Sequence, residues 1–407
     1  MNKKVSLGIT ISLVAIACAL TFVVTMTFSL NLYNDKIADV QQREEMYSKM
    51  QEIDSYIKSY SIYTIDDNDI KVGVYSGYLN GIDDVHAKYY TTNEYYYKKQ
   101  LENGTLTGLG MELGKEQGGY ISVVEVYDDS PAYEAGIIAG DVITSVGGVN
   151  VLELGYETAL SQVKFGDEGT KQRFVIRRSG EETEYNLSRR SFTISSVSGF
   201  LLDNGILYLD FDSINALTGE QVLSILGEYG EGEITGYIFD LRNCSSNVYS
   251  SVSAILNKFI GGTKLADMVY KNNSTKPLVE TDSTAFTKLP ISIIINEKTG
   301  GAAELIAVSL RDFNNAKLVG TTTMGYGTIQ ETRTFSDGTA IEISVARVRT
   351  VNESSNYNEN GISPEFAVDY SGAFESSPVN YAQTMDEQLK KAVEVIITAA
   401  ASNTENQ

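Results

Sequence analysis

Histidine and cysteine are nearly absent from this chain of 407 residues, and their scarcity excludes several kinds of site. His86 is the single histidine, so a metal site built on several imidazoles is excluded, and a Ser-His-Asp triad would have to use that residue. The two cysteines are Cys18, inside an N-terminal apolar run, and Cys244, which leaves neither a disulfide framework nor a thiolate zinc site. We expect no metal and no cofactor.

Positive charge is also scarce, because 32 Lys and Arg stand against 53 Asp and Glu, for a formal net charge of −21. The acidic residues are spread over the whole sequence rather than gathered in one tail. Such a chain repels phosphate backbones, so nucleic acid is not expected as a partner.

The N-terminus carries the strongest targeting signal, since Lys3 and Lys4 precede an uncharged apolar run over residues 5–30. As a helix this run can cross about 30 Å of hydrocarbon. A secretory signal has an apolar core of only about 7 to 15 residues and a small-x-small cleavage site, and no convincing site follows this run. We therefore favour an uncleaved single-pass anchor over a cleaved signal. Lysines before the span and an acidic chain after it predict a cytoplasmic N-terminus and a bulk that lies outside the cytoplasm, at the cell membrane.

Changes in residue pattern divide the chain into five predicted segments. Residues 1–34 form a cytoplasmic stub and transmembrane anchor, and residues 35–100 have the three- and four-residue apolar spacing of helices. Short β-type runs between glycine turns indicate a β-rich domain over 101–190. Buried-type strands alternate with helices over 191–375, which predicts an α/β core on a largely parallel sheet. Residues 376–407 are expected to be a C-terminal helix and tail.

The β-rich segment contains GLGMEL, SPAYEAG and DVITSVGG in an order that resembles a PDZ domain. In such a domain the backbone amides of the first loop capture a peptide's terminal carboxylate, while the adjacent strand edge pairs with the peptide backbone. The corresponding loop here is Gly108, Leu109, Gly110 and Met111. The alternative is a PDZ fold that serves only as a spacer.

The helical region, the PDZ-like segment and the α/β body resemble the carboxyl-terminal processing (tail-specific) serine peptidases. The resemblance rests on GIDDVHAKYYTTNEY, GILYLDFDSI, FDLRN, DGTAIEISVARVRT, NGISPEFAV and DEQLKKAVEVI, which occur in the family's order. It implies a crotonase-like or ClpP-like βαβ peptidase core with an inserted PDZ domain. It also implies serine-type peptidase (hydrolase) chemistry, in which a lysine of lowered pKa activates a serine and backbone amides hold the oxyanion.

Aligned on Glu304, the family's nucleophile motif becomes TGGAAE, and the nucleophile position falls on Gly301. The lysine motif becomes TMGYG, which puts Tyr326 in place of the base, and 326 − 301 = 25 is the separation that the family pattern requires. Gln330 keeps the family's glutamine. The family's oxyanion loop is altered as well, with Ser246 and Asn247 at its positions.

The resemblance therefore implies a peptidase family member without an intact catalytic dyad. Our hypothesis is a pseudopeptidase that binds protein or peptide C-termini without cutting them, alone, as a homo-oligomer, or with an active relative. One alternative is an active peptidase with a displaced nucleophile such as Cys244 or Thr299, and another is a structural adaptor of a cell-envelope complex. Because small residues surround both turns, Gly301→Ser with Tyr326→Lys is expected to fold.

Overall fold

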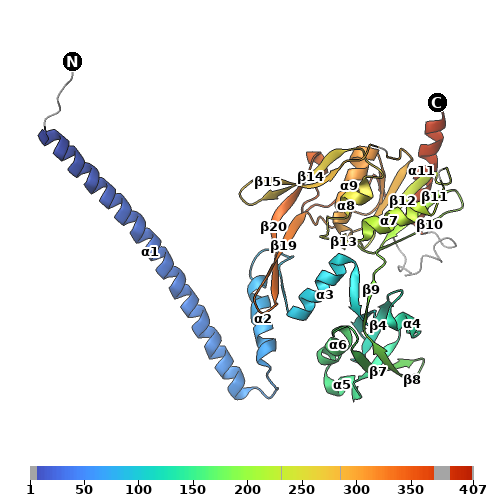
Figure 1. Cartoon of the computed structure of the whole chain (residues 1–407), viewed down its shortest axis with the longest axis horizontal. Helices are drawn as coiled ribbons and strands as arrows, with labels where there is room; N and C mark the ends of the chain where they lie inside the picture. Colours follow the sequence, from blue (N-terminus) through green and yellow to red (C-terminus); the bar gives the residue numbers. More distant parts are fainter. Residues whose placement is uncertain (1–6, 231, 285, 371–385, 406–407) are drawn as a thin grey trace. The chain divides into compact units, whose positions relative to one another are not determined.

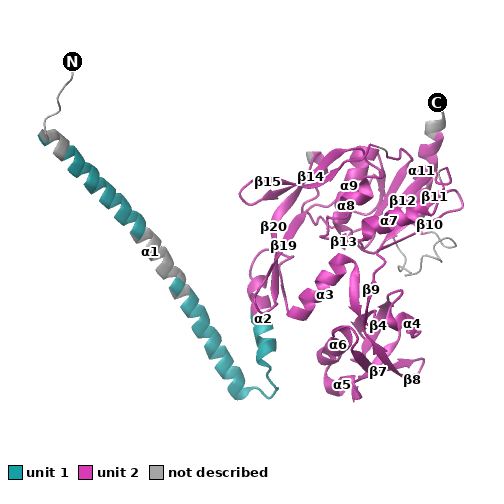
Figure 2. Cartoon of the chain, viewed as in Figure 1, with its two compact units in different colours: residues 1–74 teal, residues 75–407 magenta. Residues whose placement is uncertain are grey.

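The computed structural model describes residues 7–230, 232–284, 286–370 and 386–405 (Figure 1). The chain divides into two compact units, residues 1–74 and 75–407 (Figure 2). Helix α1 (Leu7–Tyr60) dominates the first unit, and α2 (Asp67–Asn80) begins in it. Within α1, residues Ser12–Ser29 are long and apolar enough to cross a membrane. The amphipathic region predicted after the apolar run is continuous with it, as one helix.

Helix α3 (Thr92–Asn103) in the second unit has well-defined ends. The Thr91 hydroxyl accepts a hydrogen bond from the Glu94 amide, and the Glu94 carboxylate accepts one from the Thr91 amide, which forms a capping box. Gly104 ends the helix with φ of 76°, a left-handed conformation that glycine adopts without strain.

A β-rich domain follows α3. Strand β2 (Thr105–Gly108) pairs with β9 (Arg190–Thr193), and the two connect this domain to the rest of the second unit. The domain's sheet has the order β3-β4-β5-β7-β8, with β6 paired to β5. Its elements are β3 (Met111–Lys115), β4 (Ile121–Val126), α4 (Pro131–Glu134), β5 (Val142–Val146), β6 (Val149–Asn150), α5 (Val151–Leu154), α6 (Tyr156–Lys164), β7 (Lys171–Arg178) and β8 (Glu181–Ser188).

The α/β body is built on a six-stranded sheet of order β10-β11-β12-β16-β18-β21, parallel except for the β10 and β11 pair. The strands are β10 (Val197–Leu201), β11 (Ile206–Phe211), β12 (Gly236–Asp240), β16 (Ile291–Ile295), β18 (Lys317–Gly320) and β21 (Phe366–Ala367). One face packs against α7 (Thr218–Gly227), α8 (Val252–Leu256) and α9 (Ala302–Asn314), and the other against α11 (Glu387–Glu405). Burial of both faces explains the continuous apolar strands.

A second, antiparallel sheet carries the late hairpin. Strand β20 (Ala340–Thr350) pairs with β19 (Thr328–Thr334), β14 (Thr263–Tyr270) and β1 (Lys88–Tyr90), and β15 (Thr275–Thr281) extends the sheet beyond β14. Two short strands, β13 (Ser245–Ser246) and β17 (Gly300–Gly301), pair in parallel beside the large sheet. A short 3-10 helix, η1 (Glu353–Ser355), follows β20.

The predicted fold class is confirmed, since the structure is an α/β body with an inserted β-rich domain. The five segment boundaries stay predictions. The boundary between residues 375 and 376, and the first six residues of the predicted stub, lie outside the described residues.

Candidate functional site

The turn between β17 and α9 has the shape of a nucleophile elbow. Gly301, at the N-cap of α9, has φ of 63° and ψ of −116°. Such strained strand-to-helix turns expose the nucleophile in hydrolases that use an elbow. In this chain the position has no side chain that could attack a substrate.

Glu304 connects the turn at Gly301 to the turn at Gly325 and Tyr326 through hydrogen bonds. Its carboxylate accepts hydrogen bonds from the backbone amides of Gly301 (3.0 Å), Gly325 (2.8 Å) and Tyr326 (2.8 Å), and from the Thr323 hydroxyl. The side chain is fully buried, and burial raises the pKa of Glu304 against the lowering effect of these four donors. Glu304 therefore holds both turns in register from inside the protein.

Tyr326 lies beside Gly301, as the family resemblance implies. A Cβ placed on Gly301 would lie 3.6 Å from the Tyr326 ring. The Tyr326 hydroxyl donates a 2.8 Å hydrogen bond to the Gln330 amide oxygen. Burial, with Glu342 and Asp84 nearby, raises the pKa of Tyr326 well above its ordinary value, so the phenol stays protonated. A protonated phenol that already donates its hydrogen cannot serve as the base that a serine needs.

His86 also belongs to this site, although no sequence signal linked it to position 326. Its ring stacks on Tyr326 with centroids 3.8 Å apart and planes 13° from parallel. Behind the stack, the Gln330 amide donates to the Ser344 hydroxyl (2.9 Å), which in turn donates to Asp84 (2.9 Å). Burial lowers the pKa of His86. The stack on His86 and the hydrogen bonds behind it hold the Tyr326 side chain in one position.

The oxyanion loop occupies the space in which a nucleophile would stand. A Cβ on Gly301 would lie 2.1 Å from the backbone oxygen of Ser246, closer than any real contact. The Ser246 hydroxyl fixes that loop by donating to the carbonyl of Ile214 (2.7 Å). Small neighbouring residues therefore do not by themselves make room for a side chain at position 301, because a backbone carbonyl lies in that space and would have to shift. That the Gly301→Ser, Tyr326→Lys variant folds stays a prediction.

Cys244 and Thr299, the two displaced nucleophiles considered, are both fully buried. Burial, with Asp212 and Asp210 nearby, raises the pKa of the Cys244 thiol far above its ordinary value. The Thr299 hydroxyl donates to the carbonyl of Leu241 (2.7 Å) and accepts from the amide of Asn296 (3.0 Å). Both side chains are part of the structural frame and do not line the open cleft described next.

A cleft of about 820 Å³ runs between the elbow region and the β-rich domain. From the body, Ser245, Ser246, Asn247 and Tyr326 line it, and Ser245 is exposed. Carboxylates in the lining outnumber lysines: Glu94, Glu102, Glu112, Glu125, Glu157, Asp212 and Glu342 against Lys88, Lys98 and Lys164. Burial and the neighbouring Asp212 and Glu112 raise the pKa of Glu125, which reflects this negative potential.

The predicted carboxylate loop, Gly108 to Met111, connects β2 and β3. Leu109 and Met111 are buried in the domain core, and Gly110 has φ of 86°. The carbonyl of Gly110 accepts from the amide of Tyr127 (3.0 Å), which pins the loop. Beside the loop lies a cavity of only about 20 Å³, room for about one water molecule.

Tyr97 of α3 and Lys164 at the end of α6 line this cavity together with the loop. The Lys164 amine lies 4.2 Å from the centre of the Tyr97 ring, and the Tyr97 hydroxyl donates to Glu112 of β3 (3.4 Å). A cavity of this size has no room for a terminal carboxylate, so its lining, which includes Tyr97, would have to shift to admit one.

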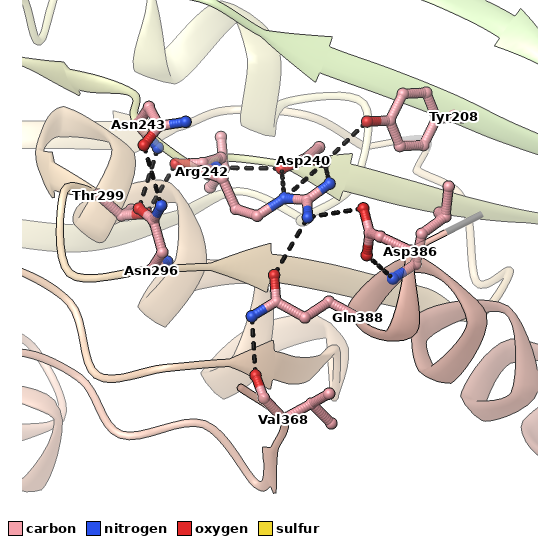
Figure 3. A network of polar contacts seen from close by, with 11 residues as sticks. Tyr208, Asp240, Arg242, Asn243, Asn296, Thr299, Val368, Asp386 and Gln388 are labelled. Carbon is pink, nitrogen blue, oxygen red and sulfur yellow. Dashed lines mark hydrogen bonds and ion pairs between the residues drawn. The ribbon is translucent and has the colours of Figure 1, made fainter. Parts of the chain in front are cut away.

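The FDLRN motif forms a buried ion-pair cluster at the end of β12 (Figure 3). The Arg242 guanidinium binds both oxygens of Asp240 and reaches Asp386 (2.8 Å) and Gln388 (3.1 Å) at the start of α11. Tyr208 donates to Asp240 from β11 (2.7 Å). Burial lowers the pKa of Arg242, but its carboxylate partners outweigh that effect and raise it overall. The cluster attaches the C-terminal helix to the sheet.

The next residue of that motif supports the elbow. Asn243 and Asn296 exchange two 3.0 Å hydrogen bonds, and the Asn296 carboxamide also accepts from the amide of Lys298 (3.1 Å). This pair fixes the loop between β16 and β17. Over the described residues, no group of three or more His, Cys, Asp or Glu is arranged to hold a metal ion.

Comparison with known proteins agrees with this architecture. The model of peptidase family S41 matches residues 205–368, and a PDZ domain model matches residues 122–178. The carboxy-terminal processing protease CtpA of Bacillus subtilis is 26% identical over 368 residues, which cover 90% of this chain and 77% of that protein. A probable CtpA-like serine protease of Staphylococcus saprophyticus is 25% identical over 373 residues, covering 90% and 74%.

The fold and the elbow define a peptidase-type α/β protein with a PDZ domain. The S41 peptidase and PDZ matches, together with the CtpA relatives, support the C-terminal processing protease family for this chain.

Proposed function

We propose that this chain is a membrane-anchored pseudopeptidase that binds protein or peptide C-termini outside the cytoplasm and does not cleave them. The proposal rests on the elbow. The Ser246 carbonyl occupies the space of a nucleophile at position 301, and a protonated tyrosine, Tyr326, occupies the position of the base. A catalytic unit without its members typically loses about 10⁴- to 10⁶-fold in rate.

The cleft between the elbow and the PDZ domain supports binding rather than catalysis. It is large enough for an extended peptide segment, and its surplus of carboxylates favours segments that carry Lys or Arg. The PDZ loop would capture the terminal carboxylate once Tyr97 moves, with Lys164 close by as a cation. The apolar stretch Ser12–Ser29 would hold the protein at the membrane.

The binding test uses the full chain in detergent and a library of peptides with free C-termini, half of them rich in Lys and Arg. Each peptide is compared with its C-terminally amidated form. We expect the free carboxylates to bind, the amidated forms to lose affinity at least about tenfold, and Tyr97→Ala to tighten binding. Equal affinity for both forms would contradict carboxylate capture, and no binding by any peptide would favour the structural adaptor.

The cleavage test incubates the same protein with unstructured proteins and reads the products by mass spectrometry. We expect no cleavage. The rival reading, an active peptidase with a displaced nucleophile, is tested by Cys244→Ala, Thr299→Ala and Ser245→Ala, the last because Ser245 is exposed and its hydroxyl lies close to Gly300. Cleavage that any one of these variants abolishes would overturn the pseudopeptidase proposal.

A further inference from the structure

Arg189 carries a buried positive charge at the point where the chain leaves the PDZ domain, between β8 and β9. Only 3% of the residue's surface is exposed. Among the residues that the structure describes, no carboxylate pairs with its guanidinium, and its Nε atom is buried without a hydrogen-bond partner. Burial lowers the pKa of Arg189, but the guanidinium of an arginine stays protonated in proteins. A buried charge without a counter-charge is costly, so its neighbours must compensate it in another way.

The C-terminal end of α6 compensates this charge. The guanidinium Nη2 atom donates to the carbonyls of Gln162 (2.5 Å) and Val163 (3.4 Å), and the Nη1 atom donates to the Thr170 hydroxyl (3.1 Å). The last carbonyls of a helix lack partners inside the helix and carry the negative end of its dipole. Gly166 leaves room for the guanidinium, since a Cβ at that position would lie 2.8 Å from the Arg189 Cζ atom. The cation and the helix end therefore neutralise each other.

The same helix end forms a wall of the predicted carboxylate site. Lys164, its last residue, lines the small cavity beside loop 108–111, and a Cβ on Gly108 would lie 3.9 Å from the Lys164 carbonyl. Gly108 is also the cross-strand partner of Arg190, the residue after Arg189. A carboxylate bound at this loop would thus lie beside the negative end of a helix, next to a cleft rich in carboxylates. Both features repel an anion unless a cation compensates them.

We propose that Arg189 allows loop 108–111 to bind an anion, because it neutralises the end of α6 beside which a peptide's terminal carboxylate would lie. Since Arg189 is buried, it acts through the helix carbonyls and does not contact the peptide, so it is a positioning residue. Lys164, the other cation nearby, is already engaged: its amine lies 4.2 Å from the centre of the Tyr97 ring and 3.9 Å from the Glu112 carboxylate. The inference rests on the proposed binding of C-termini and names a residue that favours a free carboxylate over an amide.

The test measures two affinities of the full chain in detergent, for the tightest-binding free-acid peptide from the library of the binding test and for its amidated form. Arg189→Gln keeps an N–H donor for the helix carbonyls and removes the charge. We expect it to bind the free acid about 3- to 10-fold more weakly and the amide as before, so that the preference for the free acid shrinks. Arg189→Lys keeps the charge and should retain most of the preference. Arg173→Gln removes an exposed cation from the same domain and, as the matched control, should change neither affinity.

A purely structural role for Arg189 gives a different result. Equal loss of both affinities in Arg189→Gln, or loss of neither, would overturn the proposal, while the proposed function would stand as long as free acids bind better than amides. Should Arg189→Gln fail to fold, Arg189→Lys decides alone: a folded lysine variant that has lost the preference contradicts the proposal, and one that keeps it supports the proposal. No binding of any peptide by the unchanged protein would overturn the proposed function and this inference with it.

Discussion

Two family motifs lie at the ends of neighbouring parallel strands in this protein, and they differ in what the chain has kept. At the end of β12, Asp240 and Arg242 form a complete buried cluster that binds the C-terminal helix. After β16, the elbow keeps its turn and its Glu304 but lacks the serine at position 301.

The difference separates buried residues that stabilise the fold from the two positions at which the family's nucleophile and base would act on a substrate. Glu304, Thr299 and Asn296 are buried and hydrogen-bonded to backbone, so losing any of them would leave buried donors or acceptors unpaired. Positions 301 and 326 differ from these three, because Gly301 has no side chain and the Tyr326 hydroxyl bonds to the Gln330 side chain rather than to backbone.

The largest effect is expected from breaking the Asp240 cluster. Arg242→Ala leaves the carboxylate of Asp240 buried without its cation, which should cost about 3–5 kcal/mol of unfolding free energy. Denaturant unfolding of the full chain in detergent can be followed by tyrosine fluorescence, since the sequence has 26 tyrosines and no tryptophan.

The control for that prediction is Arg173→Ala, whose partner Glu184 is 52% exposed. It should change stability by less than about 0.5 kcal/mol. If Arg242→Ala is no more costly than Arg173→Ala, the cluster does not hold the body together.

The second prediction concerns the filled elbow. Gly301→Ala should destabilise the protein by about 1–3 kcal/mol more than Gly136→Ala. Both glycines have positive φ, 63° and 72°, but a Cβ at Gly136 meets nothing within 4 Å, so the difference reports the contact with the Ser246 carbonyl together with the unusual ψ of −116° at Gly301. Unfolding curves that coincide for the two variants would mean that the oxyanion loop yields easily.

The third prediction uses pH. Burial, with Asp240 and Asp212 nearby, raises the pKa of Asp210 from 3.8 to about 8. The folded state therefore holds a proton that the unfolded state releases, so the free energy of unfolding should fall as pH rises from about 4 to about 8, by at most about 1.4 kcal/mol per pH unit from this group. Asp210→Asn should flatten that part of the stability curve. Parallel curves for the two proteins would contradict the raised pKa.

The smallest effect is expected at Tyr326, the position that the family resemblance assigns to the base. Tyr326→Phe keeps the stack on His86 and removes only the hydrogen bond to Gln330, at a cost of about 1 kcal/mol. Tyr326→Ala loses both contacts and serves as the reference. Should the phenylalanine variant be as unstable as the alanine variant, the hydroxyl and not the ring would hold this turn.

Strand and helix patterns, which are local properties of the chain, predicted the α/β body, and the resemblance to a known family implied the PDZ domain and the proximity of positions 301 and 326. The sequence did not predict the His86 stack, since those rings are 240 residues apart and nothing in either motif links them. It also did not predict the approach of the Ser246 carbonyl to Gly301, because a carbonyl's direction depends on how β13 pairs with β17, which residue size does not reveal.

The Ser246 carbonyl also has an evolutionary consequence. A single substitution that restored serine at position 301 would meet that oxygen before it met any substrate. Selection for proteolysis could act on such a reversion only after loop 245–247 had turned its backbone away. Placing a nucleophile at position 301 therefore requires a change in a second loop as well, the one at the family's oxyanion positions.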